Sequence, residues 1–478
     1  MSVRFPRRVT WVGSGAAVGG AAALAAVWPQ LGIAASLAAA GVAALIALRT
    51  RWVEVFVALL GVLLGSYMFS GRLVAHIGIP PVYVGELVLG TGVASLLFTA
   101  RRARLHPIEV LIVAFMLLGA LRTIPYLGIY GLDALRDAVL WIYGIFALAV
   151  SRALTERRLR TAVSWYAPLI VPLVVWIPIA AVAEPVSGAS APMLPGTDFS
   201  VLTFKGGDAG VHLAGALAFV LLGLYPAGTS RTLLLPLWLG AMAAAGVFNR
   251  GGLVAANVGW IALLAGRVPR GWRSLAPFVL AAVAAIALIG PSFDFGYRRV
   301  VSLAQIRDNL VSLVDDDVNP SLSGTKDFRL RWWSTIVSYT LGGEYFWDGK
   351  GFGTNLADDD GFQTMSDHSL RAPHNSHVTV LARMGVPGLA LWIALQVCFV
   401  AALLRLALRA RAAGHAWWSA VAAWLLVYWL AIVVDTSFDP YLEGPQGGIW
   451  FWSVVGAGLG VMRLYRGDAS RAVAGGPA

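Results

Sequence analysis

The sequence predicts an all-α membrane protein that crosses the bilayer many times. Hydrophobic residues make up 58% of its 478 residues and charged residues only 13%, and the mean hydropathy is +0.73. These values exceed what a soluble domain keeps in solution. The apolar residues form uncharged runs of about 20 residues, the length that a helix needs to cross the hydrocarbon core. We expect about 12 to 14 transmembrane helices in a single integral membrane domain over residues 1–478.

The predicted spans follow one another with short connections, except at one place. They cover residues 9–28, 31–48, 52–70, 82–99, 107–126, 133–151, 162–183, 209–227, 232–249, 251–266, 274–290, 376–404, 415–434 and 446–463. The first apolar run leads directly into the second without a convincing cleavage site, so we expect no cleaved signal peptide.

Arginine clusters predict the orientation in the membrane, because short exported loops disfavour Arg and Lys. The clusters alternate with the spans. They comprise Arg4, Arg7 and Arg8, then Arg49 and Arg51, then Arg101, Arg102 and Arg104, then Arg152, Arg157, Arg158 and Arg160, then Arg231, then Arg267, Arg270 and Arg273, then Arg405, Arg409 and Arg411, and finally Arg463 and Arg466. Both termini are therefore expected in the cytoplasm. The net charge of +11 reflects this rim against anionic lipid, and no nucleic-acid partner is expected.

One large loop interrupts the apolar spans. With this orientation residues 291–375, rich in charge and aromatic rings, lie outside the cytoplasm and should contain short helices. Shorter outer loops fall near 184–210 and 435–446. We expect the functional groups on this outer side of the membrane, where the longer loops lie. Cys398, the single cysteine, lies inside a span, so the chain forms no internal disulfide.

Two other classes of membrane protein lack their usual signals. A transporter commonly shows an internal repeat with matching broken spans, and neither is visible. No Gly-rich phosphate loop ending in Gly-Lys-Ser/Thr is present, so nucleotide hydrolysis lacks its usual apparatus.

Four arginines break the charge rule, since they fall at the predicted outer ends of spans: Arg72, Arg122, Arg136 and Arg250. A guanidinium near hydrocarbon is costly, about 2.5 to 3.5 kcal/mol at the bilayer centre and less at the edge. A bound anion would offset that cost, because guanidinium groups match phosphate oxygens bidentately. Arg250 is followed by two glycines, which would let backbone amides approach the same anion. The alternative is an arginine that snorkels to the interface.

Residues 323–341 predict a short helix on the outer surface. One face combines a cation with aromatic and aliphatic residues: Arg329, Trp332, Trp333, Ile336, Val337 and Thr340. Arg331 lies about 200° around the helix from Arg329, so the two cannot easily hold one small anion. We select Arg329, because tryptophans on its face would seat the helix at the membrane interface.

His374 stands at the mouth of the span that follows the large loop. An imidazole there could deprotonate a hydroxyl near neutral pH, or it could be a polar cap at the interface. A zinc site with His368 and His377 is disfavoured, because no cysteine and no glutamate occurs at ligand spacing. The acidic triplets at 315–317 and 358–360 lack the spacing of a calcium loop and read as solvated. We therefore expect no metal.

Several short motifs together resemble those of the O-antigen ligase and polymerase family, over roughly residues 200–465. They are Asn249-Arg250-Gly251, Arg329 with Trp333, the turn from Gly349 to Gly353, His374-Asn375 followed by Gly385 and Gly388, Tyr441-Leu-Glu-Gly, and Trp450-Phe-Trp. The resemblance rests on their order, spacing and predicted side of the membrane. It leaves the first 200 residues unmatched beyond their apolar character.

The resemblance implies a GT-C-like, metal-independent, inverting glycosyltransferase without cofactor, in the bacterial cytoplasmic membrane. Such an enzyme takes a glycan from undecaprenyl diphosphate and joins it to a hydroxyl of a glycan, glycolipid or protein on the outer face. In the family, arginines matching Arg250 and Arg329 hold the diphosphate and the histidine matching His374 acts near the acceptor. Further candidate residues are Arg331, Arg136, Arg122 and Asn375.

Ligase and polymerase share these motifs, so both remain open. A carboxylate-dependent polyprenyl-phosphate sugar transferase is disfavoured, because the first outer connections, at 28–31 and 71–81, contain no Asp or Glu. A flippase or exporter that forms no bond is the remaining alternative.

Overall fold

A computed structural model describes residues 51–99, 105–187, 193, 204–226, 231–265, 292–293, 301–302 and 320–474. The predicted spans at 9–28, 31–48 and 274–290 lie outside the described residues. So does the acidic triplet at 315–317. From the first part of the large loop the structure describes only two short paired strands, β3 (Ser292–Phe293) and β4 (Val301–Ser302).

The described chain is helical, which confirms the all-α prediction. The elements are α3 (Trp52–Ser70), α4 (Arg72–Ala75), α5 (Val84–Thr99), α6 (Pro107–Thr123), α7 (Leu127–Tyr130), α8 (Leu132–Ile142), α9 (Gly144–Ala153), α10 (Glu156–Ser187), α11 (Gly206–Leu221), α12 (Arg231–Phe248), α13 (Arg250–Asn257), α16 (Pro320–Leu341), α17 (Leu356–Asp359), α18 (Ser376–Ala412), α19 (Ala416–Thr436) and α20 (Pro445–Ala474). Short 3-10 turns lie at η1 (Ile124–Tyr126), η3 (Val258–Ala265) and η5 (Tyr441–Glu443), and β1 (Gly78–Ile79) pairs with β2 (Val82–Tyr83).

Every predicted span that falls on described residues coincides with a helix or a pair of helices. Among the described residues, six helices are long and apolar enough to cross a membrane, and α8 with α9 form a further candidate span with a 40° bend. Shorter apolar helices include α5, α11, α12 and the α13–η3 segment. The chain is therefore a polytopic membrane protein.

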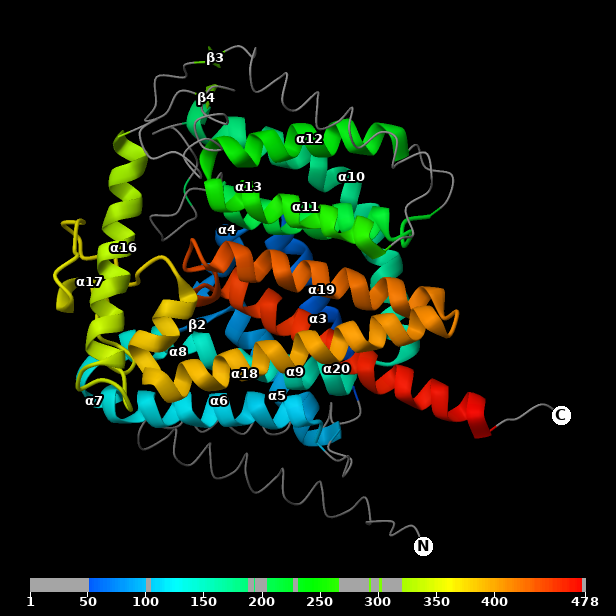
Figure 1. The fold of residues 1–478 in the computed structure, drawn as a ribbon, viewed down its shortest axis with the longest axis horizontal. Coiled ribbons are helices and arrows are strands. Elements are labelled where there is room, and N and C mark those ends of the chain that lie inside the picture. The colour runs from blue at the N-terminus through cyan, green and yellow to red at the C-terminus, as the bar shows by residue number, and fades with distance from the viewer. Residues whose placement is uncertain are drawn as a thin grey trace, which may run out of the picture.

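The apolar helices α6, α18, α19 and α11 run alongside one another, and α16 crosses their ends where α7 and α17 also lie (Figure 1). The predicted surface helix is thus present. Its residues Trp332, Ile336 and Thr340 are buried, as expected for one face. Val337, which the sequence assigns to the same face, is 40% exposed. The buried positions repeat every four residues, and each step of one residue turns the side chain by about 100°.

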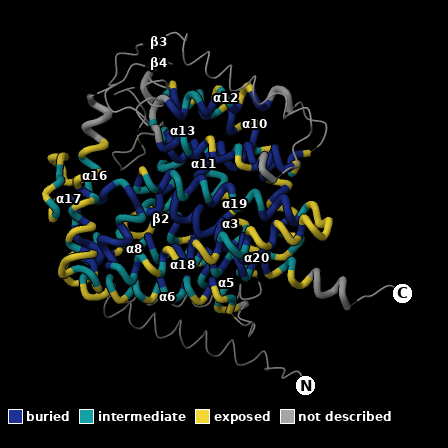
Figure 2. The backbone as a smooth tube through the Cα atoms, viewed as in Figure 1, coloured by how far each residue is buried: buried dark blue, intermediate teal, exposed yellow. Residues whose placement is uncertain are grey.

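Helix α11 forms the centre of the bundle, where all its residues are buried (Figure 2). Glycines let α13 approach it closely. A Cβ added to Gly252 would lie 2.2 Å from the carbonyl oxygen of Gly206, and one on Gly210 would lie 2.1 Å from the carbonyl oxygen of Gly252. Small residues are the usual means of such close contact between membrane helices. The contact fixes the start of α13 against the start of α11.

Candidate functional site

His374 is held in a defined place at the start of α18. Its backbone is left-handed, with φ of 53°, a conformation that is uncommon for a residue with a side chain and that clusters at functional sites. The next residue, Asn375, caps the helix, because its side-chain oxygen accepts hydrogen bonds from the amides of His377 (3.0 Å) and Val378 (3.1 Å). By capping α18, Asn375 helps to position the imidazole of His374.

Helix α16 supports His374 from the side. The indole Nε1 of Trp333 donates a hydrogen bond to the carbonyl oxygen of Pro373 at 2.8 Å. Arg329 precedes Trp333 by one helical turn, and its charge acts on His374. Arg331 is exposed. Of these two arginines, Arg329 is the one whose charge acts on the imidazole.

The surroundings of His374 keep its imidazole neutral. Burial lowers the pKa of His374 to about 4, and the positive charges of Arg329, Lys205 and Arg72 act in the same direction, while Asp439 opposes them. A neutral imidazole at physiological pH is able to accept a proton. The same cations give this end of the bundle the means to attract an anion.

Lys205 and Asp439 were not anticipated from the sequence. Lys205 precedes α11, Asp439 lies between α19 and α20, and their side chains form an ion pair. The Lys205 Nζ also lies 3.4 Å from Asp208. A possible sequence signal was that Lys205 is one of only three lysines, with Lys326 and Lys350.

The backbone of Arg250 lies at the same end. Asn249 caps α13 by accepting a hydrogen bond from the Gly252 amide at 3.1 Å. A Cβ on Gly251 would lie 3.1 Å from the Cβ of Phe438, the residue before Asp439. The predicted Asn-Arg-Gly turn therefore adjoins the α19–α20 connection. The Arg250 side chain itself lies outside what the structure describes.

The glycine turn between α16 and α17 is tied to α8 through Asp137. Gly349, Gly351 and Gly353 adopt φ of 59°, 74° and 108°, which favours glycine. Arg383 donates to the carbonyl oxygens of Gly351 (3.1 Å) and Thr354 (3.2 Å).

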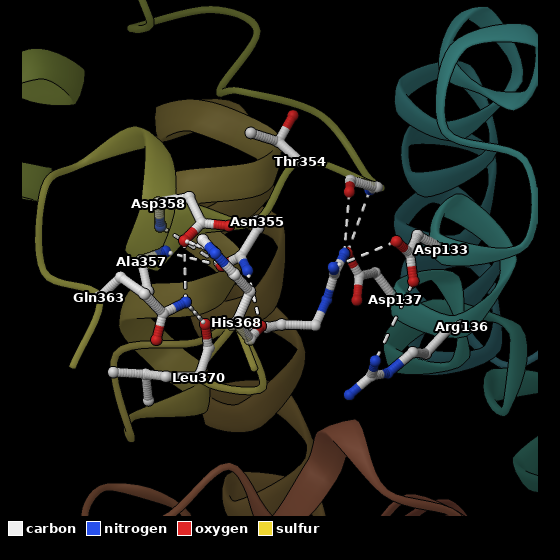
Figure 3. Close-up of polar contacts among 12 residues, drawn as sticks. Asp133, Arg136, Asp137, Thr354, Asn355, Ala357, Asp358, Gln363, His368 and Leu370 are labelled. Carbon is white, nitrogen blue, oxygen red and sulfur yellow. Dashed lines mark hydrogen bonds and ion pairs between the residues drawn. The ribbon is translucent and has the colours of Figure 1, made fainter. Parts of the chain in front are cut away.

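One carboxylate oxygen of Asp137 receives the bonds that hold this turn in place. It lies 2.8 Å from Arg383 Nη2 and 3.1 Å from Arg371 Nη2, and it accepts from the Gly353 amide at 3.1 Å. Figure 3 shows Asp133 and Asp137 of α8 facing the loop. Because Arg371 lies three residues before His374, Asp137 also fixes the approach to the imidazole.

Replacing Asp137 by Asn should destabilise the fold by about 3 to 5 kcal/mol, because it leaves the buried Arg383 without its carboxylate. The Arg383 side chain is 2% exposed, whereas that of Asp133 is 48% exposed. Asp133→Asn should therefore cost about 1 kcal/mol or less. Thermal unfolding in detergent measures both, and equal melting temperatures for the two variants would contradict the assignment.

Arg122 and Arg136 have carboxylate partners. Arg122 pairs with Asp348, and its carbonyl oxygen accepts from the Phe352 amide at 3.3 Å. Arg136 is exposed and lies 4.0 Å from Asp133. Both therefore belong to the surroundings of the glycine turn. The charges that act most on His374 come from other residues.

His368 and His377 each have partners of their own. Trp392 Nε1 donates to the Nδ1 of His377 at 2.9 Å, and the Nε2 lies 3.4 Å from the Val433 carbonyl oxygen. His368 pairs with Asp358 at 2.8 Å. The triplet at 358–360 is engaged too, since Lys350 Nζ bonds Asp359 and Asp360, each at 2.5 Å. These contacts indicate that His368, His377 and the triplet at 358–360 stabilise the fold.

Glu443 adds a second titratable group beside this network. It ends η5, within the Tyr441-Leu-Glu-Gly stretch. Burial raises its pKa to about 7, and the charge of Arg383 acts against that rise. Glu443 therefore holds its proton up to nearly neutral pH.

Fold and site together define a helical membrane protein with a neutral imidazole among fixed cations at one end of the bundle. Residues 235–393 match the family model described as O-antigen ligase. This match supports the resemblance that the sequence motifs indicate. No curated protein matches the chain. The matched segment contains Arg250, Arg329, the glycine turn and His374, and it supports a membrane transferase of the ligase or polymerase type in polysaccharide synthesis. Arg72, Lys205 and Asp439 lie outside it.

Proposed function

We propose that the chain transfers a glycan from an undecaprenyl-diphosphate carrier to a hydroxyl of a glycan, glycolipid or protein acceptor on the outer face of the bacterial cytoplasmic membrane. The observation that carries the proposal is the neutral His374 beside Arg329, within the matched segment. A base for a hydroxyl and a cation for a leaving phosphate are the two groups that this reaction requires.

In the proposed reaction His374 removes the acceptor proton as the acceptor oxygen attacks the anomeric carbon. The bond between that carbon and the diphosphate oxygen breaks, and the diphosphate leaves with the electron pair. Arg329 and Arg250 stabilise its growing negative charge with charge-assisted hydrogen bonds. Attack from the face opposite the leaving group inverts the anomeric configuration. Fixed guanidinium groups supply the charge stabilisation, so we expect chelators to leave the rate unchanged.

A cellular experiment separates this function from that of a flippase. In cells that lack the chain, lipid-linked glycan should accumulate on the outer face of the membrane, because its consumption stops there. An impermeant reagent such as periodate, applied to spheroplasts, measures the exposed fraction. Accumulation on the cytoplasmic face would show that the chain moves the glycan instead.

The proposal places residues 291–375 and the site outside the cytoplasm, with both termini inside. After replacement of the native Cys398 by Ala, a cysteine at Thr364 should react with an impermeant thiol reagent in intact cells. A cysteine at Ala412, beyond the arginines that end α18, should not react. Both positions are exposed, so the membrane alone decides the outcome. Labelling at Ala412 and protection at Thr364 would invert the orientation.

A further inference from the structure

Arg72 differs from the other arginines at predicted outer ends of spans. Arg122 and Arg136 have carboxylate partners at Asp348 and Asp133. Within the part of the chain that the structure describes, no ion pair or side-chain hydrogen bond engages the Arg72 guanidinium. A half-buried arginine near hydrocarbon without such a partner is costly. Arg72 is therefore placed to receive a ligand.

Arg72 lines a pocket between α3, α10 and α11. One end of this pocket is charged, with Arg72, Lys205 and Asp208. The apolar wall of the pocket is formed by Phe69, Trp176, Ile177 and Ala180. The pocket thus has the polarity of a lipid with a charged headgroup.

The charged end offers one available cation among its described residues. Lys205 is engaged by Asp439 and lies 3.4 Å from Asp208, so its charge is balanced by carboxylates. Arg72 remains for a ligand, and its planar guanidinium suits two phosphate oxygens at once.

The apolar wall is fixed in shape. Trp176 Nε1 donates a hydrogen bond to the carbonyl oxygen of Phe69 at 2.6 Å, which holds the indole ring against α3. Ile177 is buried beside it. A rigid aromatic and aliphatic surface of this kind binds a hydrocarbon chain with little ordering of the protein.

The pocket adjoins the site around His374. Arg72 is one of the cations whose charge acts on His374 and on Lys205. A phosphate bound at Arg72 would therefore act electrostatically on the imidazole of His374. This favours the donor lipid over a bulk phospholipid as the occupant.

We propose that Arg72 binds a phosphate of the polyisoprenyl diphosphate donor, and that the first units of its chain lie against Phe69, Trp176 and Ala180. The assignment rests on the proposed function, because the donor class comes from it. It adds a cation from the amino-terminal half, which the matched segment does not contain.

Binding of undecaprenyl diphosphate to the full chain in phosphatidylcholine nanodiscs tests the proposal. Arg72→Gln should weaken binding by about tenfold or more, since it removes a charge-assisted contact. Arg72→Lys should recover part of the loss. Arg51→Gln is the matched control, because Arg51 precedes the other end of the same helix, α3, and is exposed. Equal affinities of Arg72→Gln and the wild type would overturn the proposal.

A second variant tests the apolar wall without changing charge. Ala180→Phe should weaken binding of undecaprenyl diphosphate but leave binding of inorganic diphosphate unchanged. This variant also tests the proposal if Arg72→Gln fails to fold. Phosphatidylglycerol added to the nanodiscs should compete poorly. Competition as strong as that of the donor would assign the pocket to bulk lipid and contradict our choice of ligand.

Transfer assays on the same preparations separate the two proposals. If the wild type transfers glycan and Arg72→Gln binds and transfers equally well, the Arg72 assignment is wrong and the proposed function stands. If binding depends on Arg72 but no transfer occurs, the lipid site stands and the proposed function is wrong.

Discussion

Replacing His374 by Ala is expected to abolish glycan transfer while donor binding is largely kept. General bases contribute about 10²- to 10⁴-fold to such rates, and His374→Ala removes the proposed proton acceptor for the acceptor hydroxyl. Reconstituted liposomes with a lipid-diphosphate donor measure the rate.

His377→Ala is the matched control, because this imidazole lies three residues further on and is held between Trp392 and Val433. We expect it to lower stability more than the rate. Full activity of His374→Ala would show that His374 is not the general base.

The pH dependence follows from the lowered pKa of His374. The base is competent while the imidazole is neutral, which holds above its pKa. Because that pKa is about 4, kcat/KM should stay level from pH 7 to near pH 5 and fall only below it, instead of falling near 6.5 as for a free imidazole. Arg329→Ala should move the acidic limb to higher pH, because it removes a charge that disfavours the imidazolium. A limb at 6.5 in both proteins would show that His374 titrates as if solvent-exposed.

The second large effect is expected at the anion site. Arg329→Ala and Arg250→Ala should each lower turnover by about tenfold or more, because each removes a hydrogen bond from a charged donor to the diphosphate. Expression and detergent stability should stay near wild type.

Arg331→Ala is the control for Arg329, since it lies two residues further along α16 and is exposed. It should have a milder effect. Equal and small effects from all three substitutions would refute the diphosphate assignment.

The sequence predicts the spans well, because a bilayer of fixed thickness imposes a fixed length of apolar helix. It also predicts α16, since the repeat of Trp332, Ile336 and Thr340 marks the face that is buried. The sequence shows the local motif His374-Asn375, but the capping role of Asn375 becomes visible only in the structure, where its side chain accepts from the amides of His377 and Val378.

Contacts between distant parts of the chain leave no periodic signal. Lys205 and Asp439 are 234 residues apart, and Arg122 and Asp348 are 226 residues apart. For that reason the outer arginines formed one group in the sequence, whereas the structure separates Arg72 from Arg122 and Arg136. The role of Asp137 as the anchor of the glycine turn likewise depends on Arg371 and Arg383, which reach it only in the folded chain.

The most direct test of the central claim is mass spectrometry of the products formed by the purified protein in liposomes. An isotope-labelled glycan on undecaprenyl diphosphate is supplied with an acceptor. We expect that the label becomes covalently attached to the acceptor, that undecaprenyl diphosphate is released in equal amount, and that chelator has no effect. A label that crosses the bilayer but remains on its lipid, in the wild type and in His374→Ala alike, would contradict it.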